Sequence, residues 1–324
     1  MQLTKTILLT CIGLSLASWT QVAQAQEKFS WPQLGIDWSV IHFDRVKPEE
    51  LRTGWVFSNQ TAKYFDGEFA SDSANVTSLS FTATDNINRN FARYYRYQLY
   101  NKVGLSDADE TYLRLTGTIG WRLRSDRKRI LSLPLTLGVT EYYDGGSRND
   151  SISLRFSPQL QLPFGAEEQN TMRVQLDVEA TRYANSPDED SILVRFRPYW
   201  SWDVDDTYEI TAGLRAERRF AGADIYSRSI LGGSLSVIRK TSFEGAFLEF
   251  LVSYTHTKYD AEPAPPSTDL SGISAIAELS FNTPIKLAGE ADFSVGIGIE
   301  HVSTFQTDSR IRSPYLSVGI RKRF

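Results

Sequence analysis

The feature that most constrains the fold is a long series of segments in which apolar and polar residues alternate. From about residue 111 to the C-terminus there are about eleven such segments, separated by short stretches rich in Asp, Gly, Ser and Asn. A period of two places all the apolar side chains on one face of a β-strand. Strands of ~10 residues exceed the ~5 to 6 residues usual in soluble sheets and are long enough, when tilted, to cross a bilayer. The pattern predicts long antiparallel strands with one apolar face.

The segment 113–123 shows the alternation most clearly. Its apolar face has Leu113, Leu115, Gly117, Ile119, Trp121 and Leu123, and its polar face has Arg114, Thr116, Thr118, Gly120 and Arg122. Segments of the same kind follow near 131–139, 152–162, 171–183, 190–203, 206–219, 226–240, 245–258, 270–282, 290–303 and 315–324.

The number of strands depends on three less regular segments upstream. Including the one near 89–100, whose faces are ambiguous, gives twelve strands; including 54–65 and 76–84 as well gives fourteen. Even numbers are usual for single-chain bacterial barrels. We predict an all-β, transmembrane, antiparallel up-and-down barrel of twelve strands, with fourteen as the alternative.

A secreted soluble sheet protein is the main competing interpretation, because alternation describes any half-buried antiparallel sheet. Against it, the apolar faces are as hydrophobic at their ends as in their middles, and aromatic residues lie near the strand ends, as in an interfacial girdle. The mature chain also has no window of ~18 apolar residues that could form a spanning helix. A closed barrel is then the way to pair every backbone group within lipid.

The N-terminus predicts export. Residues 1–25 combine Lys5, an apolar run and a small-residue end at Ala23 to Ala25, which is typical of a cleaved signal peptide. The only cysteine, Cys11, lies within it, so we expect no disulfides in the mature chain. We expect residues 26–87 to form a pre-barrel segment with candidate first strands, and residues 88–324 to form the barrel.

The chain ends in YLSVGIRKRF, whose alternation and terminal aromatic residue resemble the C-terminal signal strand of Gram-negative outer-membrane β-barrels. Lys322 departs from the family pattern, which usually has an aromatic or apolar residue there. The resemblance implies the outer membrane as location, its lipids and lipopolysaccharide as surroundings, and the barrel-assembly machinery as a partner. It also implies a periplasmic C-terminus, with short turns on that side and longer loops outside. The signal residues are Leu316, Val318, Ile320 and Phe324.

Two subfamilies resemble the chain equally in architecture: solitary autotransporter-like barrels and porins for acidic oligosaccharides. An enzyme is the remote alternative, since rim-located lipases and proteases exist among such barrels. The three histidines, His42, His256 and His301, form no catalytic or metal-binding spacing. We therefore predict no enzymatic activity and no cofactor or metal. A net charge of -4 also argues against nucleic-acid binding.

Charge on the polar faces suggests what the lumen does. Eleven arginines oppose seven acidic residues on these faces. One interpretation is a passive channel that prefers small anionic solutes. The other is a filled lumen in which the charges pair and nothing is transported, with residues 26–50 as a candidate plug. The candidate selectivity residues are Arg114, Arg122, Arg155, Arg173, Arg195, Arg197, Arg215 and Arg219.

Overall fold

The computed structural model describes most of the chain from Thr53 onwards. The described residues belong to one compact unit, Asp37–Phe324, and the other unit, Met1–Ile36, lies outside them. The predicted signal peptide, Cys11, residues 26–50, His42 and Phe324 also lie outside. The described ranges are 53–66, 69–104, 111–125, 129–143, 150–165, 170–205, 207–261, 269–286, 290–305 and 309–323.

Almost all of the described chain is β-strand, with two short 3₁₀ turns, η3 (Pro187–Glu189) and η4 (Asp224–Tyr226). The strands are β1 (Gly54–Asp66), β2 (Phe69–Asn88), β3 (Phe91–Gly104), β4 (Tyr112–Arg124), β5 (Ile130–Tyr142), β6 (Ser151–Phe156), β7 (Gln159–Phe164), β8 (Asn170–Tyr183), β9 (Ser191–Asp203), β10 (Tyr208–Ala221), β11 (Arg228–Lys240), β12 (Ala246–Tyr259), β13 (Asp269–Lys286), β14 (Glu290–Thr304) and β15 (Ser309–Arg323).

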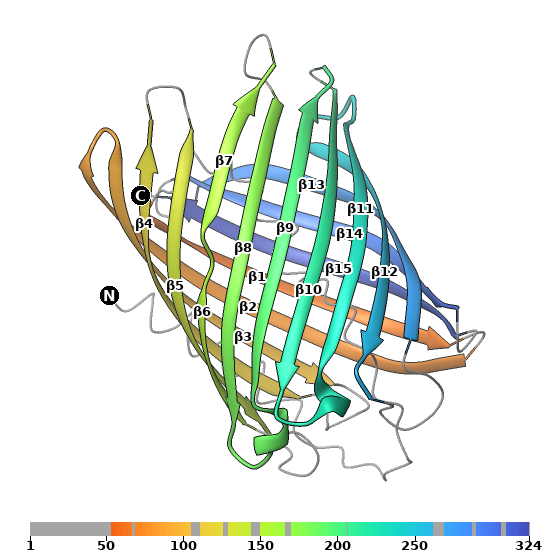
Figure 1. The fold of residues 1–324 in the computed structure, drawn as a ribbon. Helices are drawn as coiled ribbons and strands as arrows, with labels where there is room; N and C mark the ends of the chain where they lie inside the picture. Colours follow the sequence, from red (N-terminus) through yellow and green to blue (C-terminus); the bar gives the residue numbers. More distant parts are fainter. Residues whose placement is uncertain are drawn as a thin grey trace. The chain divides into compact units, whose positions relative to one another are not determined.

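These strands form one closed antiparallel barrel. Each crossing pairs with the next one in sequence, and β1 closes the ring by pairing with β15, with Ser58 opposite Gly319. In Figure 1 the strands from β8 to β12 cross the near wall, and β1 to β3 cross behind them. Closure leaves no exposed sheet edge, which is the condition for a sheet to exist in lipid.

Strands β6 and β7 together make a single crossing. Phe156 pairs with Val178 and Gln159 with Gln175, so the register against β8 continues without a shift across Pro158. Proline has no N–H to donate, and it therefore interrupts the hydrogen-bond ladder without displacing the strand. The fifteen hydrogen-bonded segments accordingly make fourteen crossings.

The fourteen-strand alternative is confirmed, and twelve strands was too few. Residues 54–65 and 76–84, which were candidate first strands, lie within β1 and β2, and β1 supplies the closing edge. The predicted segments downstream are all strands with the expected apolar faces. The two ends of the barrel also differ: we call the end where β15 finishes at Arg323 the turn end, and the end with the 104–112 and 259–269 connections the loop end.

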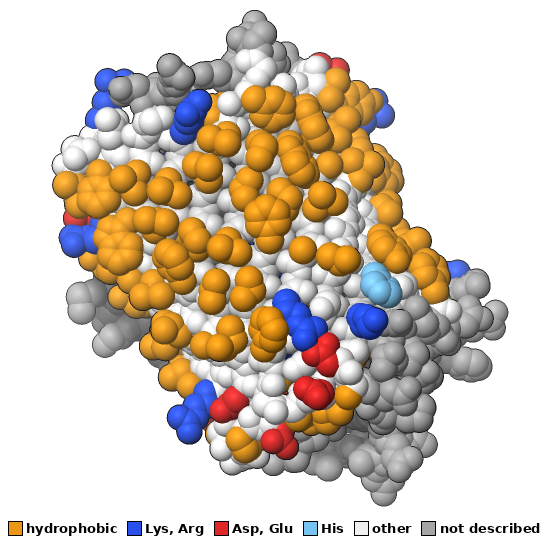
Figure 2. Space-filling model, in the orientation of Figure 1, with side chains coloured by type: hydrophobic (Ala, Val, Ile, Leu, Met, Phe, Trp, Pro, Cys, Tyr) orange, Lys and Arg blue, Asp and Glu red, His pale blue; other side chains and the backbone are white. Residues whose placement is uncertain are grey.

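The outer surface of the barrel is apolar. Large hydrophobic side chains that a soluble protein would bury are exposed here, among them Leu115, Leu214, Leu231, Leu235 and Ile297. Figure 2 shows such side chains covering one face, with most of the charged residues gathered toward the two ends. An apolar surface of this extent is expected where the solvent is lipid.

One further finding concerns helices. Within the described residues, no helix is long and apolar enough to cross a membrane.

A pair of substitutions on β11 tests which face meets lipid. Leu235 is 51% exposed on the outer face near the middle of the strand, and its neighbour Ser234 points inward. We expect Leu235→Arg to destabilise the folded barrel by ~2–4 kcal/mol, the cost of a cation at the bilayer midplane. Ser234→Arg should cost much less, because the lumen is polar. Equilibrium folding into lipid vesicles at graded urea measures both, and equal costs would contradict this assignment of faces.

Candidate functional site: the charged inner wall

The polar faces of the strands line the inside of the barrel. Arg114 Nη2 on β4 lies 3.7 Å from Glu179 Oε1 on β8, although β5 and β6 separate these strands. Side chains that far apart along a curved sheet can meet only on its concave side. By the alternation of the strands, all eight candidate arginines lie on this inner face.

Five charged residues on β8, β9 and β10 form what we call the central cluster. Arg195 Nε is 2.6 Å from Glu217 Oε2, and the same oxygen is 2.6 Å from Arg215 Nη2. Arg197 Nη2 is 2.7 Å from Asp177 Oδ2, which also lies 3.9 Å from Arg195 Nη1. The register explains the grouping, because Arg195 is directly opposite Asp177 on β8 and Glu217 on β10.

The central cluster is largely removed from solvent. Asp177 is fully buried, and its other carboxylate oxygen accepts a hydrogen bond of 2.8 Å from Gln175 Nε2. Glu217 is also buried. Buried carboxylates are tolerated only when paired and hydrogen-bonded, and three arginines supply that here. With three cations for two acids, the cluster keeps one excess positive charge.

Two further groups of luminal charge lie on opposite walls. In a ring of fourteen crossings, the crossing seven places away is diametrically opposite, so β4 faces β12, β5 faces β13, and the β6–β7 crossing faces β14. Arginines project from one side and glutamates from the other. We call Arg114, Arg122 and Arg155 the basic wall, and Glu249, Glu278 and Glu300 the acidic wall.

The acidic wall is held mainly by hydroxyl groups. Glu249 accepts a 2.9 Å hydrogen bond from Ser236 Oγ, and Glu300 accepts one of 3.0 Å from Ser274 Oγ. Glu278 accepts a 2.5 Å bond from the Tyr315 hydroxyl. Hydroxyl donors satisfy a carboxylate without cancelling its charge.

On the basic wall, Arg155 contributes uncancelled charge. Its Cα is paired in register with those of Thr136 and Glu179, but its side chain makes no hydrogen bond or ion pair within the described part of the chain. It lies four residues from the loop end of its strand, as Glu300 does on β14. The two residues thus mark a similar depth on opposite walls.

Luminal tyrosines lie flat against the wall because glycines face them. Tyr315 is directly opposite Gly298, and a Cβ on that glycine would overlap the tyrosine ring. Tyr94 and Gly120 repeat this arrangement on β3 and β4. A ring that covers a cross-strand glycine shields the backbone and stays out of the lumen.

This arrangement predicts that Gly298→Val lowers the conductance of the barrel. The added side chain displaces the Tyr315 ring toward the lumen and removes its hydrogen bond to Glu278. Gly117→Val is the matched control, because a Cβ there points outward and meets no atom within 4 Å. Single-channel current of the two variants decides: equal current in both would show that the ring does not limit the lumen.

Three of the candidate arginines lie near the ends of their strands. Arg219 donates to the backbone oxygen of Glu189 at 3.1 Å, at the loop end. Arg122 is buried near the turn end, and Arg173 is half-buried. The ambiguous faces of β3 concealed two more inner-face cations, Arg96 and Lys102, which pair in register with inner-face residues of β2 and β4.

The predicted signal strand is β15. Leu316 is exposed on the outer face, and Val318 and Ile320 share that face by alternation. Lys322 shares it too and is paired in register with Trp55 at the turn end. A lysine at a membrane rim can extend its ammonium group to water while its methylenes stay in the apolar region. Phe324 lies outside the described residues.

The described histidines face outward. His256 Nδ1 lies 2.8 Å from Ser271 Oγ on the outer surface. Within the described residues there is no group of three His, Cys, Asp or Glu side chains that could hold a metal ion. Nearby at the loop-end rim, Arg218 forms an ion pair with Asp260, and its hydrogen bonds lower the pKa of the Asp260 carboxyl below its ordinary value.

Comparison with known proteins adds context for the fold. No family model and no curated protein matches this sequence. Among solved structures, OmpTdeltaL8 of Vibrio cholerae is similar at 9% identity and a TM-score of 0.44, covering 85% of this chain and 100% of that one. OccK1 of Pseudomonas aeruginosa has 11% identity, a TM-score of 0.45 and coverage of 85% and 99%. The channel DcaP of Acinetobacter baumannii has 9% identity, a TM-score of 0.48 and coverage of 84% and 96%.

The class of protein follows from three features of the structure: the closed ring of fourteen crossings, the apolar outer surface and the polar interior. They define the chain as a transmembrane β-barrel of the outer-membrane type.

Proposed function

We propose that the protein is a passive outer-membrane channel with a modest preference for anionic solutes. The observation that supports it most directly is the separation of charge across the lumen, with the basic wall facing the acidic wall. A filled barrel has no need to keep like charges together, whereas a water-filled lumen tolerates them and acts on ions that pass.

The preference for anions follows from the total charge of the inner face. The eight candidate arginines, with Arg96 and Lys102, outnumber its seven acidic residues, which are Asp177, Glu179, Glu209, Glu217, Glu249, Glu278 and Glu300. The central cluster has one arginine more than it has acids, and Arg155 adds a cation without a described partner. Arginine keeps its charge throughout the physiological pH range, so the positive side of the lumen stays charged there. Small carboxylates and phosphates are the solute class we expect.

For orientation, we propose that the C-terminus is periplasmic and that the loop end faces outward. The connections at the turn end, such as 88–91 and 203–208, are short. The longest intervals between consecutive strands, 142–151 and 259–269, are at the loop end. Short periplasmic turns and longer outer loops are the usual arrangement. In this orientation lipopolysaccharide surrounds the loop-end half, and the barrel-assembly machinery meets β15 from the periplasm.

A structural, autotransporter-like barrel with no transport is the second candidate. The observation that favours it is the central cluster, in which four charges neutralise one another on the wall. We do not propose an enzyme, because the rim histidines His256 and His301 have no described acidic partner that would complete a catalytic site.

Solute flux into vesicles separates the two candidates. Vesicles that contain the purified barrel are diluted into isotonic solutions of a small carboxylate, a neutral sugar or a cation of similar size. A channel lets the carboxylate enter fastest and the cation slowest, and the vesicles swell in that order. No swelling above protein-free vesicles, with the barrel shown to be folded by heat-modifiable gel migration, supports the filled barrel instead.

A further inference from the structure

The outer face of β1 and β2 interrupts the apolar belt. Asn59 and Thr61 on β1 share the outward face with Phe57, and Asn75 and Thr77 share the corresponding face of β2. All four polar residues lie in the middle of their strands. The outward residues beside them are apolar, with Leu316 and Val318 on β15 and Leu79 on β2, so this face is an exception to the wall around it.

The four residues hydrogen-bond to one another. Asn59 Nδ2 donates to Asn75 Oδ1 at 3.0 Å and to Thr77 Oγ1 at 2.8 Å. Asn75 Nδ2 donates in return to Asn59 Oδ1 at 3.2 Å and to Thr61 Oγ1 at 2.8 Å. We call these four side chains the amide network. Because Asn-x-Thr occurs on both antiparallel strands, the network has a local twofold axis normal to the sheet.

The amide network uses only part of its bonding capacity. Both protons of each amide are committed, but the exposed Thr61 hydroxyl still has a proton to donate and Asn59 Oδ1 still has a lone pair to accept. Acyl chains offer no partner for either group. Polar groups that face hydrocarbon without partners are unfavourable, so this patch is a poor surface for lipid.

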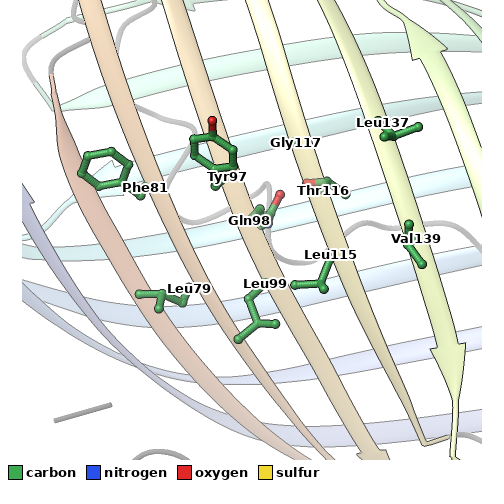
Figure 3. A pocket seen from close by; sticks show the side chains of 10 residues that line it. All are labelled: Leu79, Phe81, Tyr97, Gln98, Leu99, Leu115, Thr116, Gly117, Leu137 and Val139. Carbon is green, nitrogen blue, oxygen red and sulfur yellow. The ribbon is translucent and has the colours of Figure 1, made fainter. Parts of the chain in front are cut away.

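An apolar hollow on β2 to β5 adjoins the amide network. It has a volume of about 460 Å³ and opens outward around Gly117, where a side chain would meet nothing within 4 Å. Figure 3 shows its lining, which includes Leu79 and Phe81 of β2, the strand that also supplies half of the network. The polar patch and the hollow together form one indented surface.

We propose that this surface packs against a second copy of the chain. In a twofold contact, the Thr61 hydroxyl of each copy would donate to Asn59 Oδ1 of the other. Two hydrogen bonds would form, and both remaining groups of each copy would gain a partner. A surface that carries both a donor and an acceptor can be complementary to itself, which is what an isologous interface requires. The neutral network does not attract lipid phosphates, and the hollow supplies apolar contact area beside it. This proposal rests on the barrel being in a membrane and not on its conducting.

Cysteine cross-linking in intact outer membranes tests the proposal. Thr61→Cys places a thiol at the centre of the proposed contact, and Leu235→Cys places one on the lipid-facing surface of β11 as the matched control. After oxidation, Thr61→Cys should give a dimer of the chain on a denaturing gel, and Leu235→Cys and wild type should stay monomeric. Equal dimer yields for the two variants, or a cross-link of Thr61→Cys only to a different protein, would overturn the proposal.

A second variant tests the energetic role of the network. Asn59→Leu combined with Asn75→Leu restores an apolar belt, so the barrel should fold and keep its heat-modifiable migration. Its dimer should dissociate at about ten-fold higher protein concentration, the effect of losing two membrane hydrogen bonds. Sedimentation in detergent measures this, and a dimer that is unchanged, or a wild-type protein that is monomeric throughout, would contradict a contact through the amide network.

Discussion

Asp177→Asn is expected to destabilise the barrel by ~3 kcal/mol, the lower part of the range for breaking a buried ion pair. The substitution keeps the size of the side chain and removes its charge. Arg197 then loses its carboxylate at 2.7 Å, and Arg195 keeps only Glu217. Because Asp177 is fully buried, water cannot replace the lost interaction. The free energy of unfolding from vesicles in urea measures the effect.

The matched control makes the same change in an exposed pair. Asp85 Oδ2 lies 3.0 Å from Arg93 Nη2 near the turn end, where both side chains are well exposed. Exposed pairs contribute ~0–1 kcal/mol, so Asp85→Asn should barely change the unfolding free energy. If Asp177→Asn changed the unfolding free energy as little as Asp85→Asn, the central cluster would be well solvated. The conclusion that it is a fixed, buried part of the wall would then be wrong.

Arg155→Glu is expected to shift ion selectivity toward cations. One unit charge ~8 Å from an ion in water changes the energy of that ion by ~0.5 kcal/mol, and this substitution changes the wall by two charges. At low salt the ratio of anion to cation permeability should therefore fall by at least about five-fold, and by less at high salt as screening increases. Glu300→Gln on the opposite wall should shift selectivity the other way.

Arg182→Glu is the control for charge position. Arg182 is on β8, as part of the central cluster is, but it points outward and its side chain is 83% exposed. The same change in net charge outside the lumen should leave the reversal potential unchanged. An Arg155→Glu channel indistinguishable from Arg182→Glu would show that the basic wall does not act on permeating ions.

The downstream strands could be predicted from the sequence because lipid enforces their alternation. β1 could not be predicted with the same clarity, and its outward face shows why. After Trp55 and Phe57 come Asn59 and Thr61, so the apolar face stops halfway along the strand. A strand is easy to recognise when its inner face is polar and its outer face is apolar. On β1 both faces carry polar residues from Asn59 onwards, so the alternation is weak.

β3 was ambiguous for a different reason. Tyrosines occupy both of its faces: Tyr95 and Tyr97 point outward, and Tyr94 and Tyr100 point inward. An inward tyrosine is stable here because a glycine on the neighbouring strand receives its ring, as Gly120 does for Tyr94. That pairing depends on strand register, which the pattern of a single segment does not contain.

The inner-face position of the candidate arginines followed from alternation, but their partners did not. Arg195 meets Asp177 and Glu217 through the register of two hairpins, which a sequence leaves uncertain by a residue or two. Arg114 meets Glu179 across two intervening crossings, a contact that depends on barrel curvature. Which arginines remain uncancelled, and hence the sign of the selectivity, is therefore a property of the closed barrel.

Single-channel recording in a planar bilayer tests the central claim most directly. Purified wild-type barrel is added under a salt gradient, and the current is measured at a series of voltages. The charge arrangement predicts a stable open level whose reversal potential is displaced toward that of the anion. Absence of any conductance from protein shown to be folded, or a reversal potential displaced toward the cation, would contradict an anion-preferring channel.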